Sequence, residues 1–225
     1  MHTPHVTPRF RNRREAGRAL ASKLSKYSGR RGLIVLALPR GGVPVAYEVA
    51  RALEAPLDVF LVRKLGIPGH EELAMGAIAT GGVRVLNREL VQSLGIPESL
   101  VESITAKERS ALDRAERLYR NHRTPADLAG KTVILVDDGL ATGATVVAAI
   151  KALRNASTAR ILVAVPVAAR ETCEQLKSVA DGVVCAETPE PFRAVGLWYE
   201  DFSPTSDDEV RELLEAAANQ PASGT

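Results

Sequence analysis

The fold is decided by the segment Val133-Ile134-Leu135-Val136-Asp137-Asp138-Gly139-Leu140-Ala141-Thr142-Gly143-Ala144-Thr145. Its first four residues are apolar and mostly β-branched, which is typical of a buried parallel strand. Two adjacent carboxylates follow, then a turn of small residues and an apolar-periodic helix from Val146 to Leu153. Backbone N–H groups converge at such a turn and the helix start adds positive potential, so the segment favours a phosphate group.

The two carboxylates are expected at the carboxyl end of this strand, facing the same crevice as the turn. There Asp137 and Asp138 can accept hydrogen bonds from a sugar diol or hold Mg²⁺ through water. The alternative is an ordinary strand-to-helix turn in which one Asp caps the helix, but capping needs one carboxylate and this turn has two. No Gly-Lys-Ser/Thr follows the glycines, which excludes a Walker-type nucleotide loop.

The segment Asp137-Asp138-Gly-Leu-Ala-Thr-Gly-Ala-Thr145 resembles the motif of type I phosphoribosyltransferases that binds 5-phosphoribosyl 1-pyrophosphate (PRPP). The resemblance spans about residues 9–215 and extends to a group of predicted phosphoribosyltransferases of unassigned acceptor. It implies that Asp137 and Asp138 bind the ribose hydroxyls. It also implies that the 5-phosphate binds a loop of five residues, namely Ala141, Thr142, Gly143, Ala144 and Thr145.

A second strand end carries unusual residues, Leu38-Pro39-Arg40-Gly41-Gly42. Gly41 and Gly42 allow the backbone to approach an anion closely, and Arg40 offers a forked donor to phosphate oxygens. The alternative is a plain strand-to-helix turn with a surface arginine. In type I phosphoribosyltransferases the matching turn holds pyrophosphate, often with a cis peptide that does not precede proline. The resemblance places that bond between Pro39 and Arg40.

A third piece is Val62-Arg63-Lys64-Leu65-Gly66, which resembles the Arg-Lys pair before the mobile catalytic loop of orotate-type members. The resemblance implies that Lys64, together with Arg63, contacts the pyrophosphate. The alternative is a basic pair solvated at a strand end. Those members carry a further loop lysine, which is absent before Pro68-Gly69-His70, so the pattern does not support a leaving-group role for His70.

The C-terminal segment 187–202 is similar to the hood of hypoxanthine-type members, in which an aromatic ring stacks on the base and a later Asp approaches a metal. Phe192 and Asp201 lie near those positions, with a spacing that differs by one residue. The resemblance therefore implies Phe192 as a base contact and Asp138 and Asp201 as Mg²⁺ ligands, partly through water. Packing in the core or at an interface is the alternative for the neighbouring Trp198, Tyr199 and Phe202.

Strands alternate with helices along the chain, which predicts an α/β fold with a doubly wound, mainly parallel sheet. Ligands of such sheets bind beyond the carboxyl ends of the strands. We expect a single domain over residues 1–225 and a small hood from roughly 9–30 and 187–218. We also expect one strand over 57–62, a loop over 63–72, and a long helical insertion over 97–123 that is either a dimer arm or a surface helix.

Composition places few further constraints on function. The 225 residues carry a net charge of +2, and charges of both signs are interspersed, so the overall charge does not indicate a polyanionic partner. No apolar run of transmembrane length and no signal-peptide pattern is present, so a soluble cytoplasmic protein is expected. Cys173 and Cys185 are expected to be reduced. The basic N-terminal residues are expected to form a solvated helix face and not a nucleic-acid surface; they are Arg9, Arg11, Arg13, Arg14 and Arg18.

The resemblance implies a phosphoribosyltransferase that moves ribose 5-phosphate from PRPP onto a nitrogenous base or related amine and releases pyrophosphate. Asp137, Asp138, Lys64 and Arg40 would carry the transfer. Ala141 stands where members acting on 6-oxopurines carry an Asp, which disfavours hypoxanthine and guanine as acceptors. The alternative is a PRPP-binding regulator with little or no transferase activity, since the loop lysine is absent. A homodimer is compatible with either function, transferase or regulator.

Overall fold

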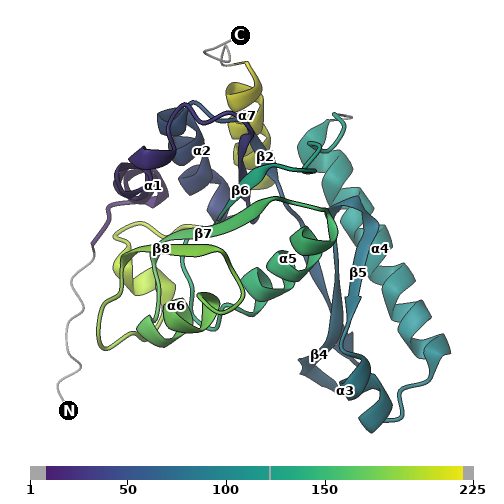
Figure 1. The fold of residues 1–225 in the computed structure, drawn as a ribbon. Helices are drawn as coiled ribbons and strands as arrows, with labels where there is room; N and C mark the ends of the chain where they lie inside the picture. The colour runs from purple at the N-terminus through teal and green to yellow at the C-terminus, as the bar shows by residue number, and fades with distance from the viewer. Residues whose placement is uncertain (1–8, 122, 220–225) are drawn as a thin grey trace.

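The computed structural model describes residues 9–121 and 123–219, apart from the side chains of residues 70–72 (Figure 1). Its main sheet has five parallel strands in the order β2-β1-β6-β7-β8. These are β1 (Leu33–Ala37), β2 (Leu57–Val59), β6 (Thr132–Val136), β7 (Arg160–Val167) and β8 (Gly182–Glu187). The predicted doubly wound, mainly parallel sheet is therefore confirmed.

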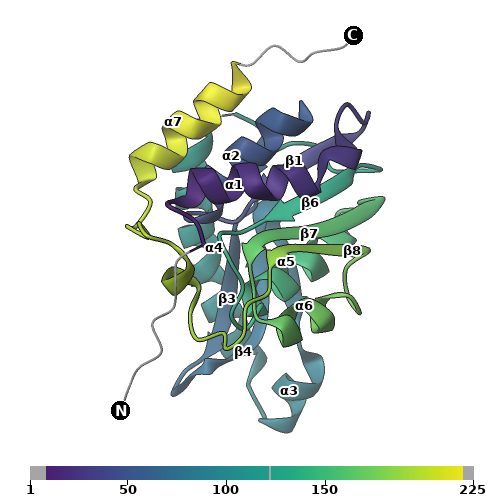
Figure 2. The same ribbon diagram turned by 90° about the vertical axis from the view of Figure 1, so that its left-hand side faces the viewer.

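Helices cover both faces of this sheet, as Figure 2 shows with α1, α2 and α7 above it and α5 and α6 below. The helices are α1 (Arg13–Lys23), α2 (Gly42–Leu53), α3 (Arg88–Ser93), α4 (Glu98–Arg120), α5 (Ala144–Asn155), α6 (Arg170–Leu176) and α7 (Asp207–Ala218). Short 3-10 turns cover η1 (Ser25–Tyr27), η2 (Thr80–Gly82) and η3 (Val195–Trp198). None of the helices in the described part of the chain combines the length and the apolar character needed to cross a bilayer.

The two hydrophobic cores follow from the alternation of side chains along each strand. Val35 of β1 and Val136 of β6 belong to the core under α1, α2 and α7. Leu36 and Leu135, each one residue away from these, belong to the opposite core under α5 and α6. Both faces are buried, which explains why these strands are continuous apolar runs in the sequence.

The region expected as one strand and a loop, 57–72, was predicted wrongly. β2 ends at Val59, and the chain continues as β3 (Val62–Ile67), which turns at Pro68-Gly69 into β4 (His70–Ala79). β3, β4 and β5 (Val83–Leu86) form a separate antiparallel sheet. The glycines that suggested a loop lie beside register shifts between β3 and β4, where the ladder is irregular. The side chain of His70 lies outside the described residues.

The expectation of two reduced cysteines was also wrong, because Cys173 and Cys185 form a disulfide. Cys173 lies in α6 and Cys185 in β8, the strand that follows this helix. A right-handed crossover returns the helix onto its own sheet, so residues 12 positions apart become neighbours. The sequence spacing did not indicate this pairing, since it arises from the crossover.

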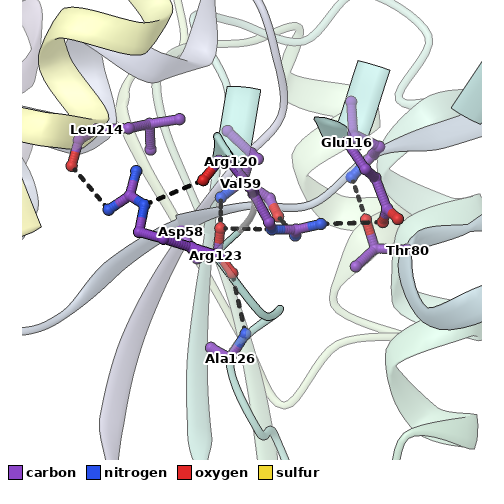
Figure 3. A network of polar contacts seen from close by, with 9 residues as sticks. Asp58, Val59, Thr80, Glu116, Arg120, Arg123, Ala126 and Leu214 are labelled. Carbon is purple, nitrogen blue, oxygen red and sulfur yellow. Dashed lines mark hydrogen bonds and ion pairs between the residues drawn. The ribbon is translucent and has the colours of Figure 1, made fainter. Parts of the chain in front are cut away.

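A buried polar network holds the end of α4 against β2 (Figure 3). Arg120, only 4% exposed, donates from Nε to Asp58 Oδ1 at 3.1 Å and from Nη2 to the Val59 carbonyl at 2.7 Å. Asp58 Oδ2 accepts from the Ala126 N–H at 3.1 Å, and Glu116 adds an ion pair to Arg120 at 3.0 Å. This network holds the helix predicted over 97–123 in place. Without it, the last turn of the helix would end beside the half-buried Asp58 carboxylate and leave that acid without its cation.

Segments from both ends of the described chain form one structure over the main sheet, called the hood here and made of residues 9–13 and 192–203. The Arg9 N–H donates to the Trp198 carbonyl at 3.0 Å, and the Glu200 N–H donates to the Phe10 carbonyl at 2.9 Å. Phe10, Trp198 and Tyr199 are buried together with Val167 of β7. Core packing therefore accounts for Trp198 and Tyr199.

Candidate functional site

Two strand ends lie side by side at one edge of the main sheet. β1 and β6 are parallel neighbours with Ala37 opposite Val136, and the Leu38 N–H donates to the Val136 carbonyl at 2.9 Å. The turn 38–42 and the motif 137–145 therefore start at the same point. Parallel sheets bind ligands at such a point, where the helices that follow two neighbouring strands pack on opposite faces. The two segments that the sequence places at strand ends therefore meet in the structure.

The turn 38–42 packs directly on the acidic pair. The bond between Pro39 and Arg40 is cis, as predicted. A Cβ on Gly41 would lie 2.7 Å from the Asp138 Cγ, and a Cβ on Gly42 would lie 2.8 Å from the Val136 carbonyl oxygen. Neither position has room for a side chain. The two glycines thus permit the close packing of one turn on the other.

Arg13 of the hood binds Asp138, the second acid of the pair. Its Nε donates to Asp138 Oδ2 at 2.8 Å, its Nη1 donates to the Ser203 carbonyl at 2.7 Å, and its guanidinium lies 4.0 Å from the centroid of the Phe202 ring. Only 11% of the Arg13 side chain is exposed. The Tyr199 hydroxyl donates to the Asp138 backbone carbonyl at 2.6 Å. The motif is therefore attached to both halves of the hood.

Burial determines the electrostatics of the two acids. It raises the pKa of Asp137 well above its ordinary value, and the adjacent charge of Asp138 raises that pKa further. Burial also raises the pKa of Asp138, although the hydrogen bond from Arg13 opposes this effect. Asp137 Oδ1 accepts the Asp138 N–H at 2.9 Å, which also favours its charged form. A hydroxyl-rich ligand would supply further donors to this half-buried pair.

The loop that follows the acids presents free donors to solvent. Gly143 adopts a left-handed conformation, with φ of 68°, and α5 begins at the next residue without a side-chain cap. The first N–H groups of α5 thus have no partner within the helix. Thr142 and Thr145 are exposed, and among the described residues neither hydroxyl has a hydrogen-bond partner. Converging N–H groups and two hydroxyls suit a phosphate.

Thr172 of α6 supports this loop from below, a contact that sequence reasoning missed. Its hydroxyl donates to the Ala141 carbonyl at 2.5 Å, and its methyl carbon lies 2.9 Å from where a Cβ on Gly143 would be. Cys173, the next residue, carries the disulfide to β8. The loop is thereby held on a helix that is covalently tied to the sheet.

Lys64 and Arg63 lie on opposite faces of the antiparallel sheet, because successive residues of a strand alternate. Arg63 Nε pairs with Glu108 of α4 at 2.6 Å. Lys64 lines a cavity whose other wall is α5, beginning at Ala144. The structure thus brings Lys64, and not Arg63, to α5, the helix that begins in the loop suited to a phosphate.

Arg40 extends from the cis turn toward α7. Its Nη1 lies 3.8 Å from Asp207 Oδ1, and half of its side chain is exposed. The same Asp207 accepts the Tyr119 hydroxyl at 2.6 Å. The Arg40 side chain is long, half-exposed and weakly held by this contact. It can therefore reach a ligand that lies over Gly41.

Phe192, predicted for the base, and Asp201, predicted for the metal together with Asp138, lie in the hood. Phe192 stacks on Trp198 with centroids 6.5 Å apart and is half-buried. Asp201 Oδ1 accepts both the N–H and the hydroxyl of Ser203, and these hydrogen bonds lower the pKa of Asp201. Arg13 contacts Asp138 directly and reaches Asp201 only through Ser203.

The donors available for Mg²⁺ are therefore few. Asp138 and Asp201 offer the carboxylate oxygens that Mg²⁺ prefers. In the described ranges 9–121 and 123–219, no three side chains of His, Cys, Asp or Glu converge as a metal site. Such a set fits an Mg²⁺ ion that takes most of its ligands from phosphate and water. It does not fit a metal held by protein atoms alone.

Sequence reasoning missed Arg13 because it treated the N-terminal arginines as one solvated face. Instead, Arg14 and Arg18 pair with the buried Glu48 at 3.7 Å and 3.5 Å, and Arg11 pairs with Glu15. Arg13 and Asp138 are separated by 125 positions, and no local pattern reports such a contact. The uneven burial of these arginines is a property of the folded chain.

Comparisons with known proteins show the family to which the chain belongs. A family model described as phosphoribosyl transferase domain matches residues 67–197. A Mycobacterium tuberculosis protein named "Putative phosphoribosyl transferase Rv0571c" is 44% identical over 208 residues, which cover 92% of this chain and 47% of that protein. The chain thus spans about half the length of the curated relatives it matches.

Two further relatives were found. The crystal structure of TT1426 from Thermus thermophilus is 44% identical, with a TM-score of 0.82, covering 92% of this chain and 97% of that chain. The protein named "Bifunctional protein PyrR" of Brevibacillus brevis is 28% identical over 119 residues, covering 51% of this chain and 65% of that protein. The first of these has the same fold over 92% of this chain.

Proposed function

The chain belongs to the phosphoribosyl transferase family, and we propose that it transfers ribose 5-phosphate from PRPP to a nitrogenous acceptor with release of pyrophosphate. One observation carries the proposal: the glycine turn 41–42 is packed onto the half-buried pair Asp137–Asp138, beside an uncapped helix start. This arrangement offers diol acceptors and phosphate donors at a single strand edge.

The 5-phosphate would bind the loop from Ala141 to Thr145. The N–H groups at the start of α5 and the hydroxyls of Thr142 and Thr145 would donate to its oxygens. Asp137 and Asp138 would accept hydrogen bonds from the ribose 2- and 3-hydroxyls. Arg13, already bound to Asp138, would keep that carboxylate charged and oriented, which makes it a positioning residue.

Pyrophosphate would bind between Gly41, Gly42, Arg40 and Lys64. As the bond to C1 breaks, charge grows on the leaving group, and fixed cations stabilise that charge. We propose that Mg²⁺ enters with the pyrophosphate, with Asp138, and Asp201 through water, as its protein contacts; when bound it would neutralise part of the leaving charge. The other task of the protein is to hold the acceptor nitrogen in line with C1.

The acceptor would lie under the hood, near Phe192. Phe192 is half-buried and already stacked on Trp198, so one face of this aromatic pair is available for a planar base. Ala141 offers no acidic partner to a ring nitrogen, which disfavours 6-oxopurines. The class of acceptor is therefore a nitrogenous base other than hypoxanthine or guanine, or a related amine. We propose a soluble, cytoplasmic enzyme, and homodimerisation remains a prediction.

Asp138→Asn is expected to weaken PRPP binding by about 1–3 kcal/mol, because the amide replaces a charged acceptor of the ribose hydroxyls. Isothermal titration with PRPP and Mg²⁺ measures the change, and circular dichroism checks that the fold persists. Glu190→Gln, at an exposed acid of the C-terminal region, is the matched control and should leave the affinity unchanged. Wild-type affinity in Asp138→Asn would remove the acidic pair from the site.

Lys64→Ala is expected to lower the transfer rate about 100-fold, because one cation that stabilises the leaving group is lost. Arg63→Ala is the matched control, since Arg63 lies on the other face of the sheet beside Glu108. Pyrophosphate release from PRPP, measured with a panel of bases, reports the rate. Equal losses in both variants would contradict the assignment of Lys64 alone.

The alternative reading is a PRPP-binding regulator, favoured by the absence of lysine in the β3–β4 turn at Pro68-Gly69. The same assay separates the two functions. PRPP binding with no pyrophosphate release for any base in the panel would support the regulator and refute the transferase. Turnover with any acceptor would support the transferase.

A further inference from the structure

A cavity of about 670 Å³ lies between α5 and the antiparallel sheet, and neither Asp137 nor Asp138 is among the residues that line it. Its sheet wall contains Lys64, Ala77 and Val85, which are paired in register across β3, β4 and β5. Its helix wall is the face of α5 that carries Ala148 and Lys151. Figure 1 shows α5 and these strands side by side, with α3 below them. Volumes of this size hold small-molecule ligands in other proteins.

Three cations face this cavity, and their charges are not compensated. Lys64, Arg88 and Lys151 line it together with a single acid, Glu89. In the described part of the chain none of the three cations has an ion pair or a hydrogen bond from its side chain. Many other arginines of the chain do have carboxylate partners, among them the three around Glu48. An excess of positive charge in a concave site attracts a polyanion.

Between the three cations, the cavity is lined by small apolar side chains. Ala77 from the sheet and Ala148 from α5 are small, and Val85 adds an apolar surface. Small apolar walls on both sides of a 670 Å³ cavity suit a planar ring, whereas a single phosphate would leave most of the volume unfilled. The combination of a slot for a ring and three cations matches a molecule with a heterocycle and several phosphates.

We propose that this cavity is a second ligand site and that it binds a nucleoside polyphosphate. The base would lie between Ala77 and Ala148, and the phosphates would contact Arg88 and Lys151. The occupant would rest on α5, the helix whose start forms the proposed phosphate loop. The inference goes beyond the transferase proposal, because Arg88 and Lys151 belong to neither the acidic pair nor the glycine turn.

The test is a titration of the full chain with ATP, GTP and UTP, followed by isothermal calorimetry. At least one of these is expected to bind with one molecule per chain. Lys151→Glu and Arg88→Ala should each weaken that binding by about tenfold or more, since each removes a cation from the phosphates. Lys23→Glu, an equal charge change at an exposed position of α1, should leave it unchanged.

Three outcomes would overturn the inference. It fails if none of the three nucleotides binds, or if Lys151→Glu binds them as the wild type does. It also fails if inorganic tripolyphosphate binds as tightly as the nucleotides, because the site would then select anions only. PRPP affinity, measured separately, should be retained in Lys151→Glu. If the wild-type chain does not bind PRPP at all, the transferase proposal is refuted and this inference still stands.

Discussion

Replacing Arg120 with methionine is expected to lower the free energy of unfolding by about 3 kcal/mol, as is typical when one partner of a buried ion pair is removed. The substitution leaves Asp58 without its cation and the Val59 carbonyl without a donor. Asp58 retains 16% exposure, which places the effect at the lower end of the range for buried pairs. Urea unfolding followed by the fluorescence of Trp198 measures it.

Arg117→Met is the matched control for this prediction. Arg117 lies on the same helix, three residues earlier, and is exposed, so its loss should change the free energy by less than about 0.5 kcal/mol. The double variant Arg120→Met/Asp58→Asn should recover part of the lost stability, because no unpaired charge remains. Equal stabilities of the two single variants would show that the network of Figure 3 does not hold α4.

Gly41→Ala is expected to abolish measurable PRPP binding and to destabilise the fold by about 1–3 kcal/mol. The backbone of Gly41 is in an ordinary conformation, with φ of −59°, so the cause is steric. Its new methyl group would overlap the Asp138 carboxylate, which would have to leave its place between the glycine turn and Arg13. Calorimetric titration with PRPP and thermal unfolding report the two effects.

The double variant Gly41→Ala/Asp138→Ala separates the clash from the loss of the acid. If the methyl group meets Asp138, Gly41→Ala should cost little further stability in a chain that already carries Asp138→Ala, so the two changes should be strongly non-additive. PRPP binding should stay weak, because an acceptor for the ribose is still missing. A Gly41→Ala chain with wild-type PRPP affinity would exclude the turn from the site.

The parts of the site that could be predicted are those encoded locally. The strand at 133–136, its two acids and the helix after Gly143 appear in the sequence as one run, and the structure forms them in that order. The cis bond between Pro39 and Arg40 was implied by family resemblance and is present. Parallel pairing then brings both turns to one edge, because strands with alternating helical connections must run the same way.

The errors concern contacts between distant residues. The segment 63–72 contains glycine and proline and was predicted as a loop, yet Lys64 pairs with Ala77 in an antiparallel ladder. Strand pairing compensates for weak local propensity there, and no window of a few residues contains that information. The disulfide of Cys173 was missed for the same reason, since it depends on a helix folding back over β8.

By itself, the sequence determined the chemistry available at each strand end: two acids and a small-residue loop after one strand, and a glycine turn with an arginine after another. Only the tertiary structure decided which side chains meet them. It placed Arg13 on Asp138 across 125 positions, turned Lys64 toward α5 and Arg63 toward Glu108. The physical reason is that turns and periodicity are set by neighbouring residues, whereas burial, ion pairing and side-chain direction are set by the packing of the whole chain.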